Sequence, residues 1–411
     1  MLTHRVVVTG MAGFSPIGND WQEIRNRLIN KQSGIRFLPA WDKYNGLLTR
    51  LGGPVENFHL PAHYTRKNTR SMGRVSLLAT RASELALTDA GLLGDPVVSG
   101  GRTGVAYGSS VGSTPAIADF GRMLIDNDIG NLNATTYLKM MGHTTTANVA
   151  VFFQIRGRVI PAVSACTSGS QAIGFAYEAI KFGLQDVMLA GGAEELCPTE
   201  AALFDALYAT STRNDEPELT PRPFDRDRDG LVIGEGGCTL VLEELERARA
   251  RGARIYAEVA GFATNADGAH ITQPNADTMQ LVMRLSLQDA GLESAQIAYV
   301  SAHGTATEQG DIAESYATAA VFGANTPISS LKGYTGHTLG ACGALEAMAA
   351  IQMMRDGWFH PNLNLEHVDS RCAELDYITG TGRTLAAEYV MSNNFAFGGV
   401  NTSLVFRRWD N

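Results

Sequence analysis

The sequence predicts an α/β protein, and three observations carry that prediction. Short apolar runs that read as buried strands alternate with stretches of helical periodicity along most of the chain. The runs at residues 103–107 and 297–302 end in turns of small residues and glycine, which is typical of strands that lead into helices. Neither a short-period repeat nor a low-complexity segment interrupts the alternation. We therefore expect mainly parallel sheets covered by helices.

The composition is that of a globular protein. Of the 411 residues, 45% are hydrophobic and 18% charged, and no segment approaches the ~20 uninterrupted apolar residues of a membrane span. The first residues lack the apolar core of a secretion signal, so we expect a cytoplasmic protein. A net charge of −9 disfavours nucleic-acid binding. Five scattered cysteines without a Cys-x-x-Cys pair indicate free thiols rather than disulfides or a metal site.

Apolar periodicity and turn residues place the elements along the chain. Strands are expected at residues 5–9, 103–107, 159–165, 186–190, 238–243, 255–262, 297–302, 327–331, near 389 and at 402–406. Helices are expected at residues 21–28, 74–90, 245–251, 278–290, 311–322 and 341–356, and another follows Cys166 and ends at Gly183. Residues 10–13 and 39–64 are rich in glycine and proline and read as loops.

Cys166 lies where a short apolar run meets a helical pattern. One face of that helix is formed by Ile173, Ala176, Tyr177 and Ile180. A cysteine in the first turn of a helix meets unpaired backbone N–H groups and the positive end of the macrodipole, which favour the thiolate. Its small neighbours Ala165 and Ser168 suit a sharp turn that carries a nucleophile. Cys166 is therefore a nucleophile candidate, and the alternative is a buried structural cysteine.

His303 and His337 also stand at turns that follow strands. His303 begins the stretch His-Gly-Thr-Ala-Thr at the end of a strand, where open α/β sheets bind their ligands. His337 lies near the start of the last predicted helix, which disfavours its protonation. Two neutral imidazoles near a thiolate would suit the stabilisation of an oxyanion that develops on a substrate. The alternative for each is a hydrogen-bonded loop histidine.

Three glycine-containing stretches are candidate binding loops. Gly398 and Gly399 permit close backbone approach, so an exposed N–H there would serve an oxyanion hole, although a plain hairpin turn is the alternative. Residues 225–236 begin like a calcium loop, but Gly236 stands where a bidentate glutamate is required. Residues 234–237 lack the Gly-Lys-Ser/Thr of a phosphate loop. We expect neither a metal nor a nucleotide at these stretches.

Together, four motifs resemble those of the β-ketoacyl-(acyl carrier protein) synthases, especially the type II elongating condensing enzymes. In order, the motifs are Ala-Cys166-Thr-Ser-Gly, His303-Gly-Thr-Ala-Thr, Lys332-x-x-x-Gly-His337-x-x-Gly-Ala and Phe397-Gly-Gly-x-Asn401. The resemblance covers essentially the whole chain. It implies the thiolase fold, with two pseudo-symmetric α/β halves in a five-layer αβαβα arrangement. Residues 1–254 would carry Cys166, and residues 255–411 would carry both histidines.

The resemblance also implies an activity, that of an acyltransferase making 3-oxoacyl carrier protein. Cys166 would accept an acyl group from an acyl carrier protein, and malonyl carrier protein would then lose CO₂ and attack it. His303 and His337 would donate hydrogen bonds to the malonyl thioester oxygen. The backbone N–H groups of Cys166 and Phe397 would form the oxyanion hole. No bound cofactor is implied, because the phosphopantetheine arm of the carrier holds the substrates.

Further residues receive roles from the same resemblance. Lys332 and Glu346 match a charged pair near the histidines. The arm would contact Thr305 and Thr307, beside the gating Phe397 with Gly398 and Gly399. Met140 and Met141 lie where relatives shape the acyl pocket at a dimer interface. Carrier docking is implied for Arg66, Lys67, Arg70 and Arg213. The partner in the dimer is a second copy or a related ketosynthase-like subunit.

Some departures from the housekeeping pattern bear on the pathway. Asn393-Asn394-Phe-Ala396 and Cys342 look more like ketosynthases of aryl-polyene or other specialised polyketide pathways than like those of fatty acid biosynthesis. Two other classes compete with an active ketosynthase. A non-catalytic subunit resembling a chain-length factor typically lacks the nucleophile, whereas this chain has Cys166 and both histidines. A thiolase carries a second cysteine where this chain has Phe397-Gly-Gly.

Overall fold

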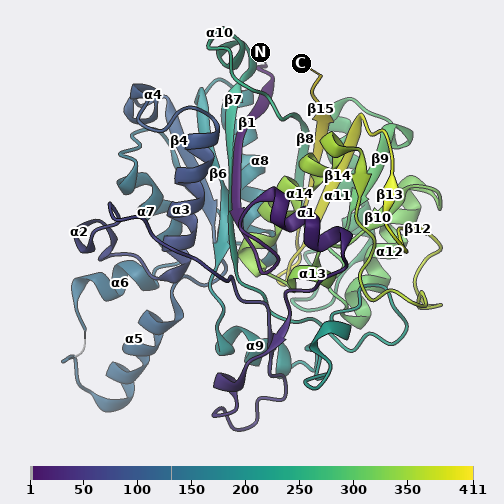
Figure 1. Cartoon of the computed structure of the whole chain (residues 1–411), viewed down its shortest axis with the longest axis horizontal. Coiled ribbons are helices and arrows are strands. Elements are labelled where there is room, and N and C mark those ends of the chain that lie inside the picture. Colours follow the sequence, from purple (N-terminus) through teal and green to yellow (C-terminus); the bar gives the residue numbers. More distant parts are fainter. Residues whose placement is uncertain (1–2, 131, 411) are drawn as a thin grey trace.

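Helices and sheet alternate in five layers, which Figure 1 shows edge-on. The computed structural model describes residues 3–130 and 132–410. In order, the layers are α3 (Arg74–Asp89) with α7 (Thr144–Phe152), one half of the sheet, α8 (Ser168–Lys181) with α14 (Cys342–Asp356), the other half of the sheet, and α11 (Ala276–Ala290) with α12 (Glu308–Phe322). The first layer lies at the left of Figure 1, and the last overlaps the second half of the sheet in that view. The αβαβα arrangement expected from the resemblance is therefore confirmed.

The two halves repeat one strand order. The first half runs β5 (Val159–Pro161), β4 (Thr103–Gly108), β6 (Val187–Glu194), β7 (Gly236–Glu244) and β1 (Val6–Phe14). The second runs β10 (Pro327–Ser329), β9 (Ile297–Ser301), β14 (Tyr389–Phe395), β15 (Val400–Arg408) and β8 (Ala257–Ala266), with β12 (Asp376–Tyr377) beyond β10. If these five principal strands of each half are numbered along the chain, both orders read 3-2-4-5-1. This shared order supports an internal duplication, which sequence identity alone was too weak to establish.

A short antiparallel pairing joins the halves. Residues 6–8 of β1 pair with residues 257–259 of β8, so the strands form one continuous sheet of 11 strands. The predicted division at residues 254 and 255 falls between α10 (Leu245–Ala250) and β8, and we keep that division as a proposal.

The expectation of mainly parallel sheets is wrong. The pairs β4/β5, β4/β6, β9/β10, β9/β14 and β10/β12 are parallel, whereas β1/β7, β6/β7, β8/β15, β14/β15 and β1/β8 are antiparallel. The antiparallel pairs lie toward the junction of the halves, where strand directions reverse. A glycine turn at residues 398–399 links β14 directly to β15, and such a tight connection requires antiparallel neighbours.

Residues 10–13 also differ from the prediction, because they continue β1 rather than forming a loop. A register shift between Val8 and Gly10 marks a bulge in that strand. A Cβ atom on Gly10 would stand 2.3 Å from the carbonyl oxygen of Ala86 in α3. Gly10 is therefore required because α3 packs closely against β1, and not because the chain turns there.

The remaining elements are short or peripheral. The helices are α1 (Trp21–Ile29), α2 (Arg66–Thr69), α4 (Pro96–Ser99), α5 (Thr114–Asp126), α6 (Ala134–Met140), α9 (Pro198–Asp205) and α13 (Lys332–Thr335). The strands β2 (Arg36–Phe37) and β3 (Leu51–Gly52) pair with each other, as do β11 (Trp358–Phe359) and β13 (Arg383–Thr384). No helix in the described part of the chain is long and apolar enough to cross a membrane.

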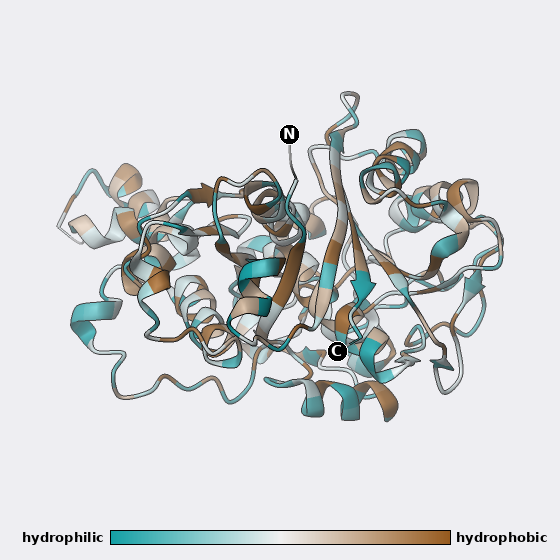
Figure 2. Ribbon diagram, turned by 90° about the horizontal axis from the view of Figure 1, so that it is seen from above, coloured by the Kyte–Doolittle hydropathy of each residue, from teal (hydrophilic) through white to brown (hydrophobic). Residues whose placement is uncertain are grey.

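Three apolar clusters fill the spaces between the layers. The largest surrounds the central helices α8 and α14, and the other two lie under α3 and under α11 with α12. Figure 2 shows the corresponding hydrophobic colour along the inner strands and on the inward sides of helices. The face of α8 expected from the sequence is buried, with Ile173 and Tyr177 at most 4% exposed. Burial on this scale fixes the turns at the ends of the strands, where the site lies.

Candidate active site

Three turns bring a thiol and two imidazoles together at the lower edge of the sheet in Figure 1, near α9 and α13. Cys166 follows β5, His303 follows β9, and His337 follows α13. Atoms of these three side chains able to bind a metal or accept a proton lie within 4.8 Å of one another. The imidazole centroids are 5.1 Å apart and the rings are nearly perpendicular, at 86°. The residues that the sequence singled out separately therefore share one site.

Cys166 occupies a strained and closely packed turn. It lies in the 3-10 turn Ala165–Thr167, directly before α8, and Ala165 has a φ of +51°. Such a left-handed residue before the nucleophile is a feature of strained strand-to-helix turns. A Cβ atom on Gly192 would lie 2.0 Å from the carbonyl oxygen of Gly340. The glycine thus lets the first half approach the turn that carries His337.

The thiol of Cys166 does not show the lowered pKa that the helix start predicts. Burial raises its pKa to about 11. The charge of Lys332 and hydrogen bonds from the backbone N–H groups of Phe397 and Cys166 lower it only in part. The expectation of a thiolate was wrong because it weighed the local helix start and left out the desolvation of a residue that is 4% exposed.

His303 is held from behind by charged and polar side chains. Lys332 Nζ lies 3.1 Å from His303 Nδ1, and Asn394 Nδ2 lies 3.3 Å from the same nitrogen. An ammonium group can only donate, so Nδ1 accepts and the ring proton resides on Nε2. Burial, followed by the charge of Lys332, holds the pKa of His303 well below its ordinary value. His303 is therefore a neutral imidazole that presents an Nε2–H group.

His337 reaches the same state through the backbone. The N–H of Leu339 donates to His337 Nδ1 at 3.3 Å, which again leaves the proton on Nε2. His337 Nε2 is buried and has no hydrogen-bond partner in the described structure. Burial and the charge of Lys332 hold its pKa well below the ordinary value. Neutrality was predicted for this residue, but burial rather than the helix start is the main cause.

Lys332 and Glu346 form a buried ion pair behind the histidines. Their side chains are 1% and 2% exposed, and the ammonium is hydrogen-bonded to the carboxylate. Asn394 Nδ2 donates to the other carboxylate oxygen at 2.6 Å. Burial would lower the pKa of Lys332, but the Glu346 carboxylate outweighs it and raises that pKa. The pair is thus a source of fixed positive charge beside His303, which disfavours both its protonation and a bound metal cation.

Phe397 and its glycine turn close the other side of the thiol. The backbone N–H groups of Phe397 and Cys166 lower the pKa of the Cys166 thiol in part, so both approach its sulfur. The N–H of Gly398 donates instead to the carbonyl of Ile271 at 2.8 Å. The N–H of Gly398 is therefore engaged, and the oxyanion-hole role expected for the N–H of Phe397 stays a prediction. The ring of Phe397 packs against Phe204, with centroids 5.1 Å apart.

A cavity of about 420 Å³ leads from the surface to these groups. Thr305 and Thr307 line it, and their hydroxyl oxygens are 2.8 Å apart. Phe397 and Gly399 also line the cavity, whereas Gly398, Met140 and Met141 do not. A substrate in this cavity would therefore contact two hydroxyl groups as well as Cys166.

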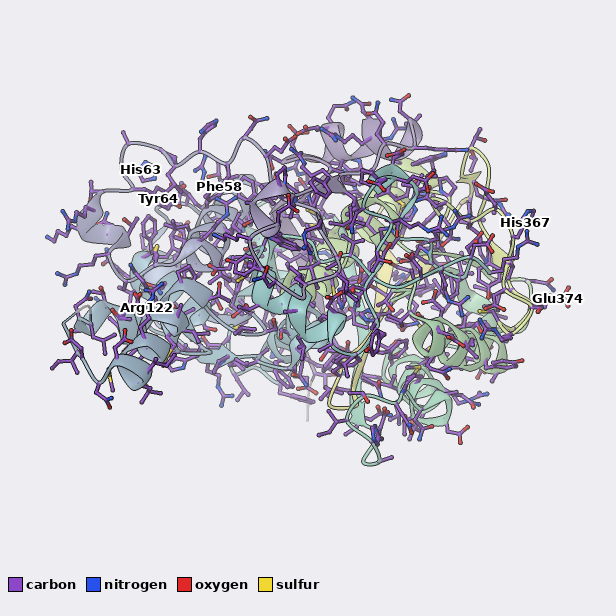
Figure 3. The ribbon with its side chains drawn as sticks, turned by 90° about the horizontal axis from the view of Figure 1, so that it is seen from below. Phe58, His63, Tyr64, Arg122, His367 and Glu374 are labelled. Carbon is purple, nitrogen blue, oxygen red and sulfur yellow. The ribbon has the colours of Figure 1, made fainter. Side chains whose placement is uncertain are left out.

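The basic residues expected to dock a carrier do not form one group. Arg66, Lys67 and Arg70 lie in or next to the exposed helix α2, far from α9 in Figure 1. Figure 3 places His63 and Tyr64, which directly precede α2, at the same end of the molecule as Arg122 of α5. Arg213 lies elsewhere and is engaged, with Nη2 donating to the carbonyl of Asp227 at 2.9 Å. It is therefore less available to a partner than the three basic residues around α2.

Two carboxylates that sequence reasoning missed support the His303 turn. Glu314 accepts from the backbone N–H groups of His303 and Gly304, at 2.7 and 2.6 Å. Asp311 accepts from the N–H groups of Thr305 and Ala306 at 3.0 and 3.1 Å. Burial raises the pKa of Asp311 to about 6 and that of Glu314 to about 8. The sequence signal for both residues was the presence of acidic side chains on the face of α12 that packs inward, just after the His-Gly-Thr motif.

A third missed carboxylate supports the His337 turn. Glu194, at the end of β6, accepts from the N–H of Gly340 at 3.0 Å and from the N–H of Ser110 at 2.7 Å. It thereby ties the first half of the molecule to the turn that holds Leu339 and His337. The calcium-like segment is, by contrast, an ion-paired turn. Its buried Asp225 accepts from backbone N–H groups and pairs with Arg222 at 3.2 Å, whereas Arg226 and Asp227 are exposed.

Similarity to known proteins agrees with this geometry. The N-terminal domain of β-ketoacyl synthases matches residues 3–248, and their C-terminal domain matches residues 256–366. The chain is 38% identical to 3-oxoacyl-[acyl-carrier-protein] synthase 2 of Vibrio cholerae, over 99% of this chain and 100% of that protein. It is 39% identical to 3-oxoacyl-[acyl-carrier-protein] synthase 1 of Escherichia coli, over 98% and 99% of the two chains.

Solved structures show the same relationship. A β-ketoacyl synthase from Burkholderia phymatum superposes with a TM-score of 0.98 at 59% identity, covering 99% of this chain and 100% of that one. The ishigamide ketosynthase/chain length factor reaches 0.90 at 31% identity, with the same coverage. A type II polyketide ketosynthase in complex with its acyl-carrier protein reaches 0.87 at 32% identity, again with that coverage. With its thiol and two imidazoles joined in the thiolase fold, the chain belongs to the β-ketoacyl synthase family of condensing acyltransferases.

Proposed function

We propose that this protein condenses an acyl group held on Cys166 with malonyl carrier protein, giving 3-oxoacyl carrier protein, free carrier protein and CO₂. The observation that carries the proposal is the pair of buried, neutral imidazoles whose Nε2–H groups face the thiol. A hydrolase would need a histidine that accepts the proton of its nucleophile. Here both Nδ1 atoms already accept hydrogen bonds, and both Nε2 atoms hold protons. The site is built to donate to an oxygen.

Acylation is the first half of the reaction. The acyl thioester of a carrier protein enters through the cavity, and the sulfur of Cys166 attacks its carbonyl carbon. The N–H groups of Cys166 and Phe397 stabilise the tetrahedral oxyanion. The carrier thiol leaves with the proton of Cys166, so the sulfur ends as a thioester. Burial keeps the resting thiol of Cys166 protonated. During acylation the acyl group therefore moves from the carrier sulfur to the Cys166 sulfur, and the proton moves in the opposite direction.

Condensation is the second half. Malonyl carrier protein occupies the cavity left by the first carrier arm, with its thioester oxygen between His303 and His337. Loss of CO₂ from the malonyl group leaves an electron pair on the α-carbon and negative charge on that oxygen, which both Nε2–H groups stabilise. The α-carbon attacks the acyl thioester, the thiolate of Cys166 leaves, and a proton from solvent restores the resting thiol. Burial and, after it, the charge of Lys332 keep both imidazoles neutral.

Two other classes of protein fit less well. A non-catalytic chain-length factor needs no ordered donors, whereas this chain holds both histidines in one tautomer. A thiolase needs a second cysteine that reaches the substrate. Cys342 is such a candidate by proximity, but its Sγ points to the carbonyl of Cys166 at 3.2 Å and it does not line the cavity.

The test follows the two halves separately. Purified protein is given acyl carrier protein, and intact mass measures an acyl adduct, which Cys166→Ala should abolish. The same variant should still release CO₂ from malonyl carrier protein, because both imidazole donors remain. His303→Ala should do the opposite, forming the adduct while losing CO₂ release. If the protein formed no adduct and released no CO₂ with any acyl donor, the proposed function would be wrong.

The protein also acts as a dimer in this proposal. Strand β5 ends the sheet, and apolar side chains surround it, with Val151, Val159 and Val163 at 77%, 47% and 47% exposed. Pairing of β5 with its counterpart in a second subunit would cover both the strand edge and these side chains. Met140 and Met141 would then meet the acyl pocket from across that interface. Native mass spectrometry distinguishes a homodimer from a monomer that awaits a related subunit.

We further propose a specialised substrate, with an aryl or unsaturated acyl chain, rather than the saturated chains of fatty acid synthesis. The departures at Asn393, Asn394 and Cys342 support this assignment, and Asn394 contacts both His303 and Glu346. Intact-mass measurement with saturated, unsaturated and aryl acyl carrier proteins tests it. A preference for long saturated chains would contradict the specialised assignment and leave the condensation itself intact.

A further inference from the structure

Three glutamates lie close together where β6 leads into α9, and they differ in how many hydrogen bonds they accept. Glu195 accepts from the N–H and the hydroxyl of Thr114, both at 2.8 Å, and from the N–H of Val75 at 3.2 Å. Glu194 accepts through Oε2, but its Oε1 has no partner in the described structure. Glu200 is 4% exposed, and neither of its oxygens has a partner there. Glu195 therefore supports the fold, whereas Glu200 makes no such contact.

The buried carboxyl group of Glu200 is costly to the fold. Burial of a polar group without a hydrogen bond destabilises a protein, so a buried carboxyl group of this kind requires an explanation. Burial, followed by the charge of Glu194, holds the pKa of Glu200 well above its ordinary value. Glu200 is therefore an uncharged carboxylic acid at neutral pH. Such a group donates one hydrogen bond through its O–H and accepts others through its C=O.

Glu194 connects this neighbourhood to the nucleophile. Burial is the main cause of the raised pKa of the Cys166 thiol, and the negative charge of Glu194 adds to it. Glu194 also accepts from the N–H of Gly340, in the turn that follows His337. The fully buried hydroxyl of Ser109 lacks a partner as well, and a Cβ atom on Gly340 would lie within 2.8 Å of both Ser109 and Glu194. Free polar atoms therefore lie within electrostatic reach of the sulfur.

Helix α9 leads from the mouth of the active-site cavity toward Glu200. Tyr208, just after the helix, lines the cavity and is 87% exposed, and Phe204 lines it four residues earlier. Glu200 lies a further four residues back on the same buried face, about 6 Å along the helix at a rise of 1.5 Å per residue. Phe204 belongs to the buried apolar cluster that contains Cys166. The Glu200 carboxyl group is therefore farther from the mouth than Phe204.

The order of the reaction determines where the acyl chain lies. In the proposed function the acyl group stays on Cys166 while the arm of malonyl carrier protein occupies the cavity of about 420 Å³ that leads to the surface. The acyl chain on the sulfur cannot share that space, so it has to point away from the mouth. Glu200 and Glu194 lie on that side.

We propose that Glu200 determines specificity for the acyl chain by hydrogen bonding to a hydroxyl group at the far end of that chain, with Glu194 Oε1 as a second acceptor. The inference rests on the proposed function and deepens it, because it names the class of acyl group that the site takes. A hydroxyl group donates and accepts, as a carboxylic acid does, so the two form a matched pair. A hydrocarbon end would leave the carboxyl group unpaired, and a site built to bind a hydroxyl group discriminates against an analogue that lacks it.

Acylation of Cys166 by matched donors tests the assignment. 4-Hydroxycinnamoyl and cinnamoyl carrier protein differ by one hydroxyl group on an aryl chain, and 8-hydroxyoctanoyl and octanoyl carrier protein differ by one on an alkyl chain. The same carrier protein delivers every donor, so its own binding contributes equally. In at least one pair, kcat/KM for the hydroxylated member should be about tenfold higher. The pair that shows the preference identifies the chain as aryl or alkyl.

Three variants locate the source of this preference. Glu200→Met replaces the carboxyl group by an apolar side chain of similar length, and the preference should disappear. Glu200→Gln keeps a donor and an acceptor and should retain most of it. Glu246→Met removes a carboxylate of α10 that is 71% exposed, and it should leave the preference unchanged. General damage to the site would lower both members of a pair equally, so the ratio within a pair reports on the hydroxyl group alone.

Two results would overturn the inference. If the unchanged protein accepts both members of each pair equally, the carboxyl groups bind water rather than the acyl chain. If Glu200→Met keeps a preference for hydroxylated chains, another residue binds the hydroxyl group. Either result leaves the condensation intact. If the unchanged protein forms no adduct with any of these donors, the proposed function itself is contradicted.

Discussion

The two histidines present the same Nε2–H group but are held by different parts of the protein. His303 Nδ1 meets Lys332 Nζ at 3.1 Å and Asn394 Nδ2 at 3.3 Å, and both of those side chains bind Glu346. Among the described residues, His337 Nδ1 meets only the backbone N–H of Leu339, at 3.3 Å. The orientation of His303 thus depends on a network of buried side chains, whereas that of His337 depends on the backbone conformation of its own turn.

The difference determines how each donor can fail. A buried ionic network contributes little net stability while intact, but it is costly when one member is removed, because the remaining charge has no partner. A backbone donor cannot be deleted by substitution, so only a shift of the turn can remove it. We therefore expect single substitutions to affect His303 through charge and His337 through packing.

The largest effect is expected from Lys332→Met. The Glu346 carboxylate would be left buried without its counter-ion, and the free energy of unfolding should fall by about 3–5 kcal/mol. His303 Nδ1 would lose its ammonium donor and keep only the contact with Asn394 Nδ2 at 3.3 Å, so the Nε2–H tautomer would be held less firmly. CO₂ release from malonyl carrier protein should fall about 100-fold or more. Urea unfolding and a CO₂ assay measure the two effects.

A double variant separates the two effects. Lys332→Met with Glu346→Leu replaces the ion pair by apolar side chains, which is often neutral or stabilising. Stability should return while CO₂ release stays low. If CO₂ release returned together with stability, Lys332 would contribute only to the stability of the fold. His303 would then not depend on the charge of Lys332, and the two histidines would not differ in this respect.

The next effect is expected from Gly340→Ala, at the His337 turn. A Cβ atom there would lie 2.7 Å from Ser109 Cα and 2.8 Å from Glu194 Oε2. The turn must move, and with it the N–H of Leu339. We expect a loss of about 1–3 kcal/mol in the free energy of unfolding. CO₂ release should fall about tenfold through the displaced donor.

Gly121→Ala is the matched control, because a Cβ atom on Gly121 meets nothing within 4 Å and its φ is ordinary. That variant should keep full stability and activity. Full activity in Gly340→Ala would mean that burial alone orients His337. It would contradict the claim that the backbone N–H of Leu339 holds this imidazole.

The same contrast explains what the sequence could and could not predict. Motifs are local, so Cys166, His303 and His337 were recognisable one at a time, and each stands beside a turn as expected. The alternating pattern also predicted the α/β class. The parallel sheet was predicted wrongly, because strand direction depends on which distant strands pair. The thiol pKa was predicted wrongly because burial comes from the whole fold.

Partners that lie far apart in the chain were missed for a similar reason. Glu194 precedes Gly340 by 146 residues and comes from the other half of the molecule. Nothing near Glu194 in the sequence indicates the turn that it supports. Asp311 and Glu314 were closer at hand, since they fall in the helix after His303, and their acidic side chains on a buried face were a signal that went unused.

The third prediction concerns the pH dependence of stability that comes from Glu194, the carboxylate that supports the His337 turn. Burial raises the pKa of Glu194 to about 7 from an ordinary value of 4.5. Between these values the folded protein keeps a proton that the unfolded chain releases, so this residue's contribution makes the fold less stable as pH rises from 4.5 to 7. Above that range the cost is constant. Glu194→Gln, which cannot ionise, should lose this part of the decline when urea unfolding is followed from pH 5 to 8. Parallel stability curves for the two proteins would contradict the assignment.

The smallest effect is expected from Cys342→Ala. In the described structure, Cys342 hydrogen-bonds with Cys166 and Asn394 but with neither histidine. Cys342 Sγ donates to the carbonyl of Cys166 at 3.2 Å, and Asn394 Nδ2 lies 3.7 Å from that sulfur. Burial holds the pKa of this thiol well above its ordinary value, so it carries no charge that either histidine would feel. We expect a change of about 1 kcal/mol in the free energy of unfolding. CO₂ release should stay within about twofold, since no donor to either imidazole is removed. A tenfold loss would instead place Cys342 in the chemistry, as the second cysteine of a thiolase, and would require a path from its sulfur to the cavity.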